Sequence, residues 1–182
     1  MKWVTRENAN VDRIACPWLI RRFIDAEAEF LFVPRDQVLE TAAQQGAHSY
    51  DAPGAEYTHR DGKCSFDVLV EEFGLAGDPA MVRLAAIVHA ADVSKDRDTS
   101  PEGRGLYAIA HGFALLHGTE DHKKIDLETP MYDALYAWCQ EQATPAYPAT
   151  SSPGISVPGP PAGVRPVLLP RPAHRGGPAP PP

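Results

Sequence analysis

The stretch VDRIACPWLIRRFIDAEAEFLFVP (Val11–Pro34) holds both kinds of secondary structure in one continuous segment. Its first half spaces apolar residues as a helix does, and it predicts a helix over residues 11–25 that begins after Asn8 or Asn10. Its second half, FLFV at residues 30–33, is an unbroken apolar run with the length of a buried strand. The stretch therefore predicts a helix that is followed directly by a strand.

Signals on either side of this stretch extend the prediction to the rest of the chain. Lys2–Arg6 (KWVTR) predicts a short strand, and Asp78-Pro79 and Ser100-Pro101 each place a capping side chain before a proline at the first helical position. The remaining predicted helices lie at residues 36–45, 66–73 (with Ser65 as N-cap), 79–93, 101–116 and 132–142. The predicted fold class is α+β and mostly helical, with about six helices and a small sheet near the N-terminus.

The composition changes sharply near residue 144. Of the 19 prolines, 13 lie in residues 145–182, a segment that contains no Asp or Glu. Such a segment cannot bury enough apolar surface to offset its ordering entropy, so residues 144–182 are predicted to form a Pro-rich disordered tail. Residues 1–143 are predicted to form a single domain. Without the tail, the chain keeps 14 Lys and Arg against 24 Asp and Glu, and so acidic a domain is not expected to bind nucleic acid.

The cysteines and the N-terminus indicate a cellular compartment. Cys16, Cys64 and Cys139 are far apart and form no CxxC motif, which fits a reducing environment without structural disulfides. The N-terminus has no signal-peptide core, and no run of about 18 apolar residues occurs that could span a membrane. The expected location is the cytoplasm.

Four segments in the same order resemble a known family. Val11–Pro34 is the longest and most unusual, and His59–Asp67 (HRDGKCSFD), Ile87–Asp92 (IVHAAD) and Tyr132–Trp138 (YDALYAW) agree with it. Together they resemble the carboxy-terminal domain of the ChrB family of bacterial chromate-resistance proteins, over about residues 1–143. The resemblance implies a role in the response to chromate stress, and it supplies no set of catalytic residues. Longer family members carry an N-terminal region associated with regulation, and this chain begins at the carboxy-terminal domain, so direct DNA binding is not expected.

Arginines are the first candidate site for an oxyanion such as chromate. Arg13, Arg21 and Arg22 follow one another at helical spacing, with Arg13 and Arg21 on nearly the same face. Arg60 adds a fourth cation from a later loop. The planar fork of arginine donates two parallel hydrogen bonds to a tetrahedral anion. The alternative is that these arginines form ordinary ion pairs with nearby carboxylates.

Cys64 is the candidate for redox or nucleophilic chemistry. It precedes a predicted helix and follows Arg60 and Lys63, a setting that predicts a lowered thiol pKa and a catalytic or sensing role with an oxidant such as chromate. A buried cysteine that acts only as a small apolar residue is the alternative.

A metal site is the third candidate. His89 and Asp92 are three residues apart on a predicted helix, so that they share a face, and His59 and Cys64 could complete the ligand set from the preceding loop. Imidazole and carboxylate ligands suit Fe, Mn or Zn. A histidine that is hydrogen-bonded to a nearby aspartate is the alternative. Asp121-His122, by contrast, is interpreted as a solvated turn.

These sites support two functions of different classes. The first is a binding domain that senses chromate or a related oxyanion or metal through Arg13, Arg21, Arg22 and Arg60. The second is a metal-dependent redox enzyme that acts on chromate, or on the superoxide and peroxide that chromate reduction produces. A separate regulatory partner protein is also expected, and no membrane partner is expected.

Overall fold

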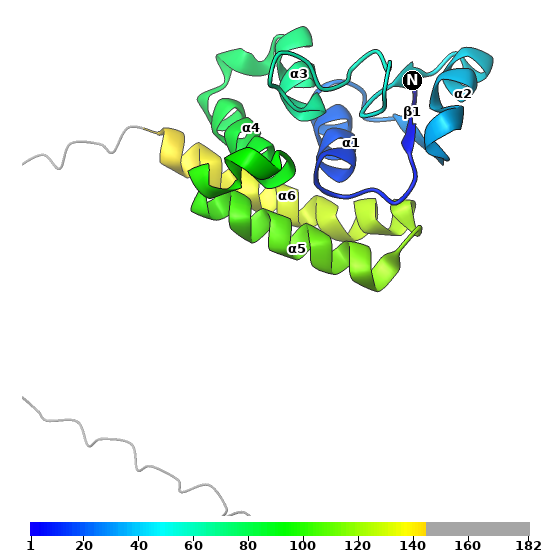
Figure 1. The fold of residues 1–182 in the computed structure, drawn as a ribbon. Coiled ribbons are helices and arrows are strands. Elements are labelled where there is room, and N and C mark those ends of the chain that lie inside the picture. Colours follow the sequence, from blue (N-terminus) through cyan, green and yellow to red (C-terminus); the bar gives the residue numbers. More distant parts are fainter. Residues whose placement is uncertain (145–182) are drawn as a thin grey trace, which may run out of the picture. The chain divides into compact units, whose positions relative to one another are not determined.

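The computed structural model describes residues 1–144, and all of the predicted Pro-rich tail after its first residue, Thr144, lies outside these residues. The described part is mostly helical, with a small parallel sheet near the N-terminus (Figure 1), which confirms the predicted fold class. Its strands are β1 (Lys2–Arg6), β2 (Glu29–Val33) and β3 (His48–Ser49). Its α-helices are α1 (Val11–Phe23), α2 (Val38–Gln45), α3 (Ser65–Glu72), α4 (Pro79–Asp92), α5 (Pro101–His117) and α6 (Asp121–Ala143). Short 3₁₀ helices span Arg35–Gln37, Leu75–Gly77 and Ser94–Thr99.

The sheet has the strand order β2-β1-β3, and both pairings are parallel. Trp3 of the central strand lies opposite Phe30 on one side and His48 on the other. Parallel neighbours need a crossover connection, which α1 provides between β1 and β2, and α2 between β2 and β3. The carboxyl ends of all three strands therefore meet at one edge of the sheet.

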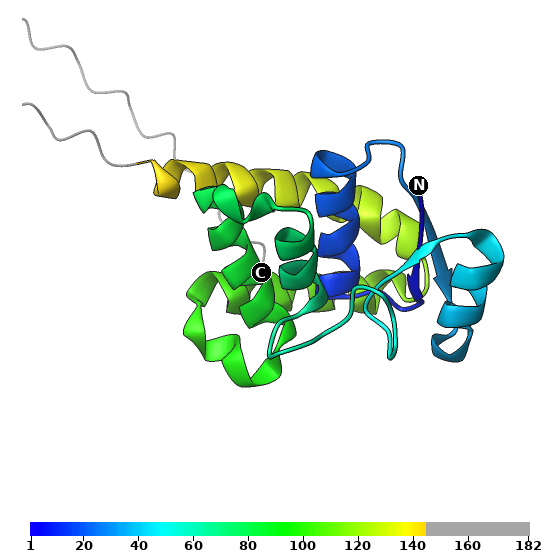
Figure 2. The ribbon, with the colours of Figure 1, turned by 90° about the horizontal axis from the view of Figure 1, so that it is seen from above.

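The two faces of the sheet are buried against different helices. Trp3 belongs to the main core, which includes α1 and the other long helices. Val4, on the opposite face, packs with Val38 of α2 in a second, smaller cluster. This follows from the alternation of side chains along a strand. Figures 1 and 2 show the sheet between α1 and α2, an arrangement that shields both faces of β1.

The helices beyond residue 64 pack around α4. This helix contacts α1, α3, α5 and α6, and its Leu84 and Val88 are fully buried. Helices α5 and α6 run side by side beneath it (Figure 1). Within residues 1–144, no helix is both long enough and apolar enough to cross a membrane.

Several predicted helix boundaries are confirmed by the structure. Asn10 caps α1, and Asp78 and Ser100 cap α4 and α5, each directly before a proline. One predicted cap is wrong, because Cys64 and not Ser65 is the N-cap residue of α3. The Ser65 amide is already occupied, since it donates to the Asp12 carboxylate at 2.7 Å.

The predicted start of the last helix and the predicted turn at Asp121 are also wrong. Helix α6 begins at Asp121, eleven residues before the predicted start at Tyr132. The buried Asp121 carboxylate accepts the backbone N–H groups of Asn8 and Ala9, and it pairs with Lys124 at 2.8 Å. The Lys124 ammonium is itself fully buried and also donates to two backbone carbonyl groups. These contacts fix the start of α6 against the loop between β1 and α1.

Candidate functional site

A pocket of about 270 Å³ opens at the carboxyl edge of the sheet, beside the ends of β1 and β3. The chain leaves β1 towards β2 and later returns to the other side of β1, so the strand order reverses here. Ligands of open parallel sheets usually bind at such a point. Figure 2 shows the loop after β3 beside the first turn of α1. The pocket is lined by Arg6, Arg13, Arg35, Asp51, Ala52, Pro53, Thr58, His59 and Asp92.

Asp12 is buried beside His59, which lines this pocket. It lies in the first turn of α1, and only 1% of its surface is exposed. Its carboxylate accepts the backbone N–H groups of Ser65 at 2.7 Å and Phe66 at 3.0 Å, so that it satisfies free donors at the start of α3. Burial raises the pKa of Asp12 above its usual value, and the hydrogen bond with His59 partly opposes this. Asp12 thus joins α1 to α3 beside the pocket.

Asp51 follows β3 and holds two arginines. Its backbone adopts a left-handed conformation with φ of 42°, which aspartate tolerates better than most residues. Its Oδ2 atom lies 3.0 Å from Arg6 and 2.9 Å from Arg13. Burial alone would raise the pKa of Asp51, but the hydrogen bond with His59 and the charges of both arginines lower it.

His59 is the centre of the site. Its Nε2 atom lies 3.4 Å from Asp12, 3.4 Å from Asp51 and 3.3 Å from Asp92. Hydrogen bonds with these three carboxylates raise the pKa of His59 to about 12. A single ring nitrogen carries at most one proton, so it cannot donate a separate hydrogen bond to all three oxygens. Arg6 and Arg13 balance the charge of Asp51, whereas Asp12 and Asp92 form ion pairs, among the described residues, only with His59.

The ligand types at this point fit a divalent metal. One atom each from Asp12, His59 and Asp92 lies within 4.8 Å of the other two. A carboxylate-rich set with one imidazole suits Fe, Mn or Zn, and Asp51 lies beside this set, 3.4 Å from the His59 Nε2 atom. His59 and Asp92, both predicted as metal ligands, are brought together here, and Asp12 and Asp51 join them.

The other two predicted ligands lie in a different group. Cys64 and His89 meet Asp67, and one atom from each lies within 4.8 Å of the others. The four residues His59, Cys64, His89 and Asp92 thus divide between two neighbouring groups instead of surrounding one point. The predicted lowering of the Cys64 pKa is wrong, because burial and then the charges of Asp12 and Asp67 raise the pKa of this thiol.

The predicted arginines are also separated in space. Of the four predicted arginines, Arg13 is the one that lines the pocket of His59. Arg6 and Arg35, which the sequence did not indicate, line it as well. Arg22 pairs with Asp133 of α6 at 2.6 Å, and Arg60 pairs with Glu72.

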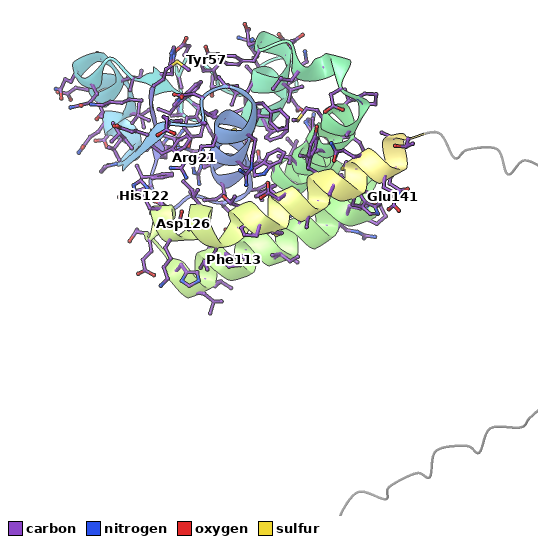
Figure 3. All side chains as sticks on the ribbon, turned by 180° about the vertical axis from the view of Figure 1, so that it is seen from behind. Arg21, Tyr57, Phe113, His122, Asp126 and Glu141 are labelled. Carbon is purple, nitrogen blue, oxygen red and sulfur yellow. The ribbon has the colours of Figure 1, made fainter. Side chains whose placement is uncertain are left out.

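Arg21 lies away from the pocket of His59. Its guanidinium stacks over the Phe30 ring, 5.0 Å from its centroid. Arg21 and Asp126 line a different pocket, between α1 and α6 (Figure 3). Arg13 and Arg21 both belong to α1, but helical spacing could not show which elements cover each end of that helix.

The residues that the sequence did not single out share one property. Arg6, Asp51 and Asp67 each have a side-chain partner in the site that lies at least 22 positions away in the chain. A weak signal existed for Arg6 and Asp51, because residues at the carboxyl ends of parallel strands commonly form sites. That signal depends on knowing that the sheet is parallel.

The chain is similar in sequence to one protein family over most of its described length. The family described as ChrB, C-terminal domain, matches residues 3–139. The chain is 44% identical over 137 residues to Protein ChrB of Cupriavidus metallidurans (strain CH34), which covers 74% of this chain and 40% of that protein. The chain thus spans less than half the length of this curated relative. No solved structure matches the chain.

Proposed function

The chain belongs to the ChrB C-terminal domain family, and from that membership we propose that it is a chromate-resistance domain that binds chromate or a related tetrahedral oxyanion at a metal-assisted site. The site is the pocket at the carboxyl edge of the sheet. Membership agrees with the resemblance of Val11–Pro34 and of the three later segments. The proposal covers binding and sensing, and a separate regulatory protein would act on the bound state.

One observation supports the proposal most directly. The Nε2 atom of His59 faces three carboxylates at 3.3–3.4 Å inside a pocket that three arginines also line. A pocket lined only by carboxylates would repel an oxyanion. A pocket lined only by arginines would bind an oxyanion without any carboxylates. A metal held by Asp12, His59 and Asp92 would supply positive charge and an open coordination position for an anionic oxygen.

The arginines have different tasks in this proposal. Arg6 and Arg13 both hold Asp51, and they keep that carboxylate ionised beside His59. Arg35 lies at the pocket rim with an exposed side chain, and within residues 1–144 its guanidinium has no hydrogen-bond partner. Arg35 is therefore the donor that is free to bind a tetrahedral oxyanion with two parallel hydrogen bonds.

Calorimetric titration with chromate and with sulfate, on protein supplied with Mn²⁺ or Zn²⁺, which chromate does not oxidise at neutral pH, tests this function. We expect the wild type to bind an oxyanion only when metal is present. His59→Ala should lose both metal and oxyanion, and Arg35→Ala should keep the metal and bind the oxyanion at least tenfold more weakly.

Two control variants make the test specific. Arg104→Ala removes an exposed arginine outside the pocket, and it should bind like the wild type. Arg21→Ala tests the alternative arginine set on α1. Equal oxyanion binding by the wild type and by Arg35→Ala, or binding that Arg21→Ala abolishes, would contradict the proposed site.

A metal-dependent redox activity is the second candidate function. It is favoured by the ligand set of one histidine and two aspartates beside an open pocket, because this leaves metal positions free for a small oxygen species. Consumption of superoxide by Mn- or Fe-loaded protein tests it without an added reductant, since dismutation uses two superoxide ions as oxidant and reductant. A loaded protein that is no faster than the free metal ion would exclude this activity.

A further inference from the structure

The start of α3 carries a second group of metal-binding side chains. Cys64 contributes a sulfur atom, Asp67 a carboxylate oxygen and His89 a ring nitrogen, and these atoms lie within 4.8 Å of one another. None of the three belongs to the Asp12, His59 and Asp92 group. The second group is also chemically different, because it contains a thiol.

Local helix geometry brings two of these side chains together. Cys64 and Asp67 form a reciprocal capping box at the first turn of α3, in which the Asp67 carboxylate accepts the Cys64 N–H at 3.1 Å. Serine or threonine is the usual residue at that position. Serine would cap α3 at least as well, so the need of the helix for a cap does not account for cysteine here.

His89 reaches this group from α4 in a fixed orientation. Its Nδ1 atom lies 2.6 Å from the Asp67 carboxylate, and its Nε2 atom lies 3.1 Å from Asp96. A carboxylate on the outer nitrogen of an imidazole is the usual partner of a metal-binding histidine, because it fixes the tautomer and directs the other nitrogen to the metal. Asp96 occupies that place at Nε2, and a metal bound at Nδ1 would replace the proton that this nitrogen shares with the Asp67 carboxylate.

A cavity of about 510 Å³ lies against the same side chains. Asp67 and His89 line it together with apolar residues of α3 and α4, among them Val70, Val82 and Ala85. Cys64 is fully buried on the inner side of the group. The group thus has three protein ligands on one side and an accessible space on the other.

We propose that Cys64, Asp67 and His89 bind a Zn²⁺ ion, with Asp96 orienting His89 and the fourth position of the metal facing the cavity. Sulfur, nitrogen and oxygen ligands are the set that zinc takes in proteins, and three protein ligands with one open position are typical of its reactive sites. The hard, sulfur-free group at His59 would not compete equally for this ion. This site is independent of the proposed oxyanion site and would exist even if that proposal failed.

Cobalt(II) is a direct probe, because a thiolate ligand gives bound cobalt a near-ultraviolet charge-transfer absorption that oxygen and nitrogen ligands do not give. We expect the full-length protein to develop this absorption with one equivalent of Co²⁺, and Zn²⁺ to remove it by displacement. Cys64→Ser should abolish the absorption, and its α3 should remain folded because serine is a good N-cap. Circular dichroism checks that the variant is folded.

Three further variants make the experiment decisive. Cys139→Ser removes another buried cysteine, on α6, and His59→Ala disables only the oxyanion site, so both should keep the absorption. Asp96→Asn should keep it but weaken Co²⁺ binding about 10- to 100-fold, as loss of an orienting partner does. Absence of the absorption in the wild type, or its persistence in Cys64→Ser, would overturn the proposal. Loss of the absorption in a folded His59→Ala variant would show that the thiolate-bound cobalt depends on His59, and it would overturn the proposal as well.

Discussion

Glu128 of α6 is a buried carboxyl group with an unusual environment. Its side chain is almost fully buried, and its Oε2 atom has no hydrogen-bond partner among the described residues. Burial raises the pKa of Glu128 to about 7, and the charge of Lys124 only partly opposes this. The folded protein therefore binds this proton more tightly than the unfolded chain does.

The Glu128 environment predicts a loss of stability as the pH rises. Its contribution is fully present below the ordinary pKa of a glutamate and is lost as the pH rises through about 7. Glu128→Gln should remove this dependence and, at pH 8, raise the free energy of unfolding by on the order of 2 kcal/mol. Urea denaturation between pH 5 and pH 8 measures both effects. A wild-type stability that rises over this range to the same extent as that of the variant would contradict the assignment.

Asp12 is predicted to stabilise the fold as well as the site. Asp12→Ala leaves the buried N–H groups of Ser65 and Phe66 without their acceptor, which should lower the free energy of unfolding by about 2–4 kcal/mol. Asp126→Ala, at an exposed carboxylate of α6, should change it by less than about 0.5 kcal/mol. Denaturant titration of the two variants gives the comparison, and equal stabilities would show that the Asp12 cap contributes nothing.

At the level of single residues, sequence reasoning identified groups by chemistry better than by location. His59, Cys64, His89 and Asp92 all lie in groups with metal-ligand geometry, but in two groups instead of one. Asp12 is a neighbour of the predicted Arg13, yet its partners Ser65 and Phe66 lie more than 50 residues away. Burial raises the pKa of Cys64 instead of lowering it, because the low-dielectric surroundings disfavour the thiolate more than the charges of Arg60 and Lys63 favour it. These two cations pair instead with Glu72 and Glu71.

The contact between α4 and α5 depends on one glycine. A Cβ atom added at Gly103 would lie 2.7 Å from the Ala90 Cβ and 3.1 Å from the Ile87 carbonyl oxygen. Gly103→Ala should therefore destabilise the protein by about 1–2 kcal/mol, even though alanine is the better helix former.

Gly105 and Gly112 of the same helix provide the matched controls. An added Cβ atom meets nothing within 4 Å at either position, so alanine should stabilise each by roughly 0.5–1 kcal/mol. Thermal unfolding of the three variants measures the contrast. A stabilised Gly103→Ala would show that α5 is free to move away from α4.

At the level of elements, prediction succeeded where the signal was local. The caps at Asn10, Asp78 and Ser100 act within their own first turns, and α1, α4 and α5 begin where those caps predicted. The start of α6 was missed because the partners of Asp121 are the N–H groups of Asn8 and Ala9, more than 110 residues away. No pattern in residues 121–131 reports that contact.

The described domain should respond to metal as one cooperative unit. The His59 group combines side chains from α1, the loop after β3 and α4, so a bound ion would connect that loop to both helices. A metal concentration 100 times the Kd adds about 2.7 kcal/mol to the free energy of unfolding, which corresponds to a rise in Tm of roughly 10 °C in a domain of this size.

Calorimetry with Mn²⁺ tests this response. The wild type should unfold in a single transition that shifts upward with Mn²⁺, and His59→Ala should show no shift. A shift of only one of two resolved transitions would indicate that the sheet and the helices unfold separately.

The buried ammonium of Lys124 offers a chemical reporter of the folded state. Its three hydrogens point to the Asp121 carboxylate and to the carbonyl groups of Ala9 and Gly118. The neighbouring Lys123 is half exposed. An acylating reagent should therefore label Lys123 at once and reach Lys124 only when the start of α6 separates from the loop between β1 and α1. The ratio of the two labels, read by peptide mass spectrometry, would measure how often that separation occurs in the native protein.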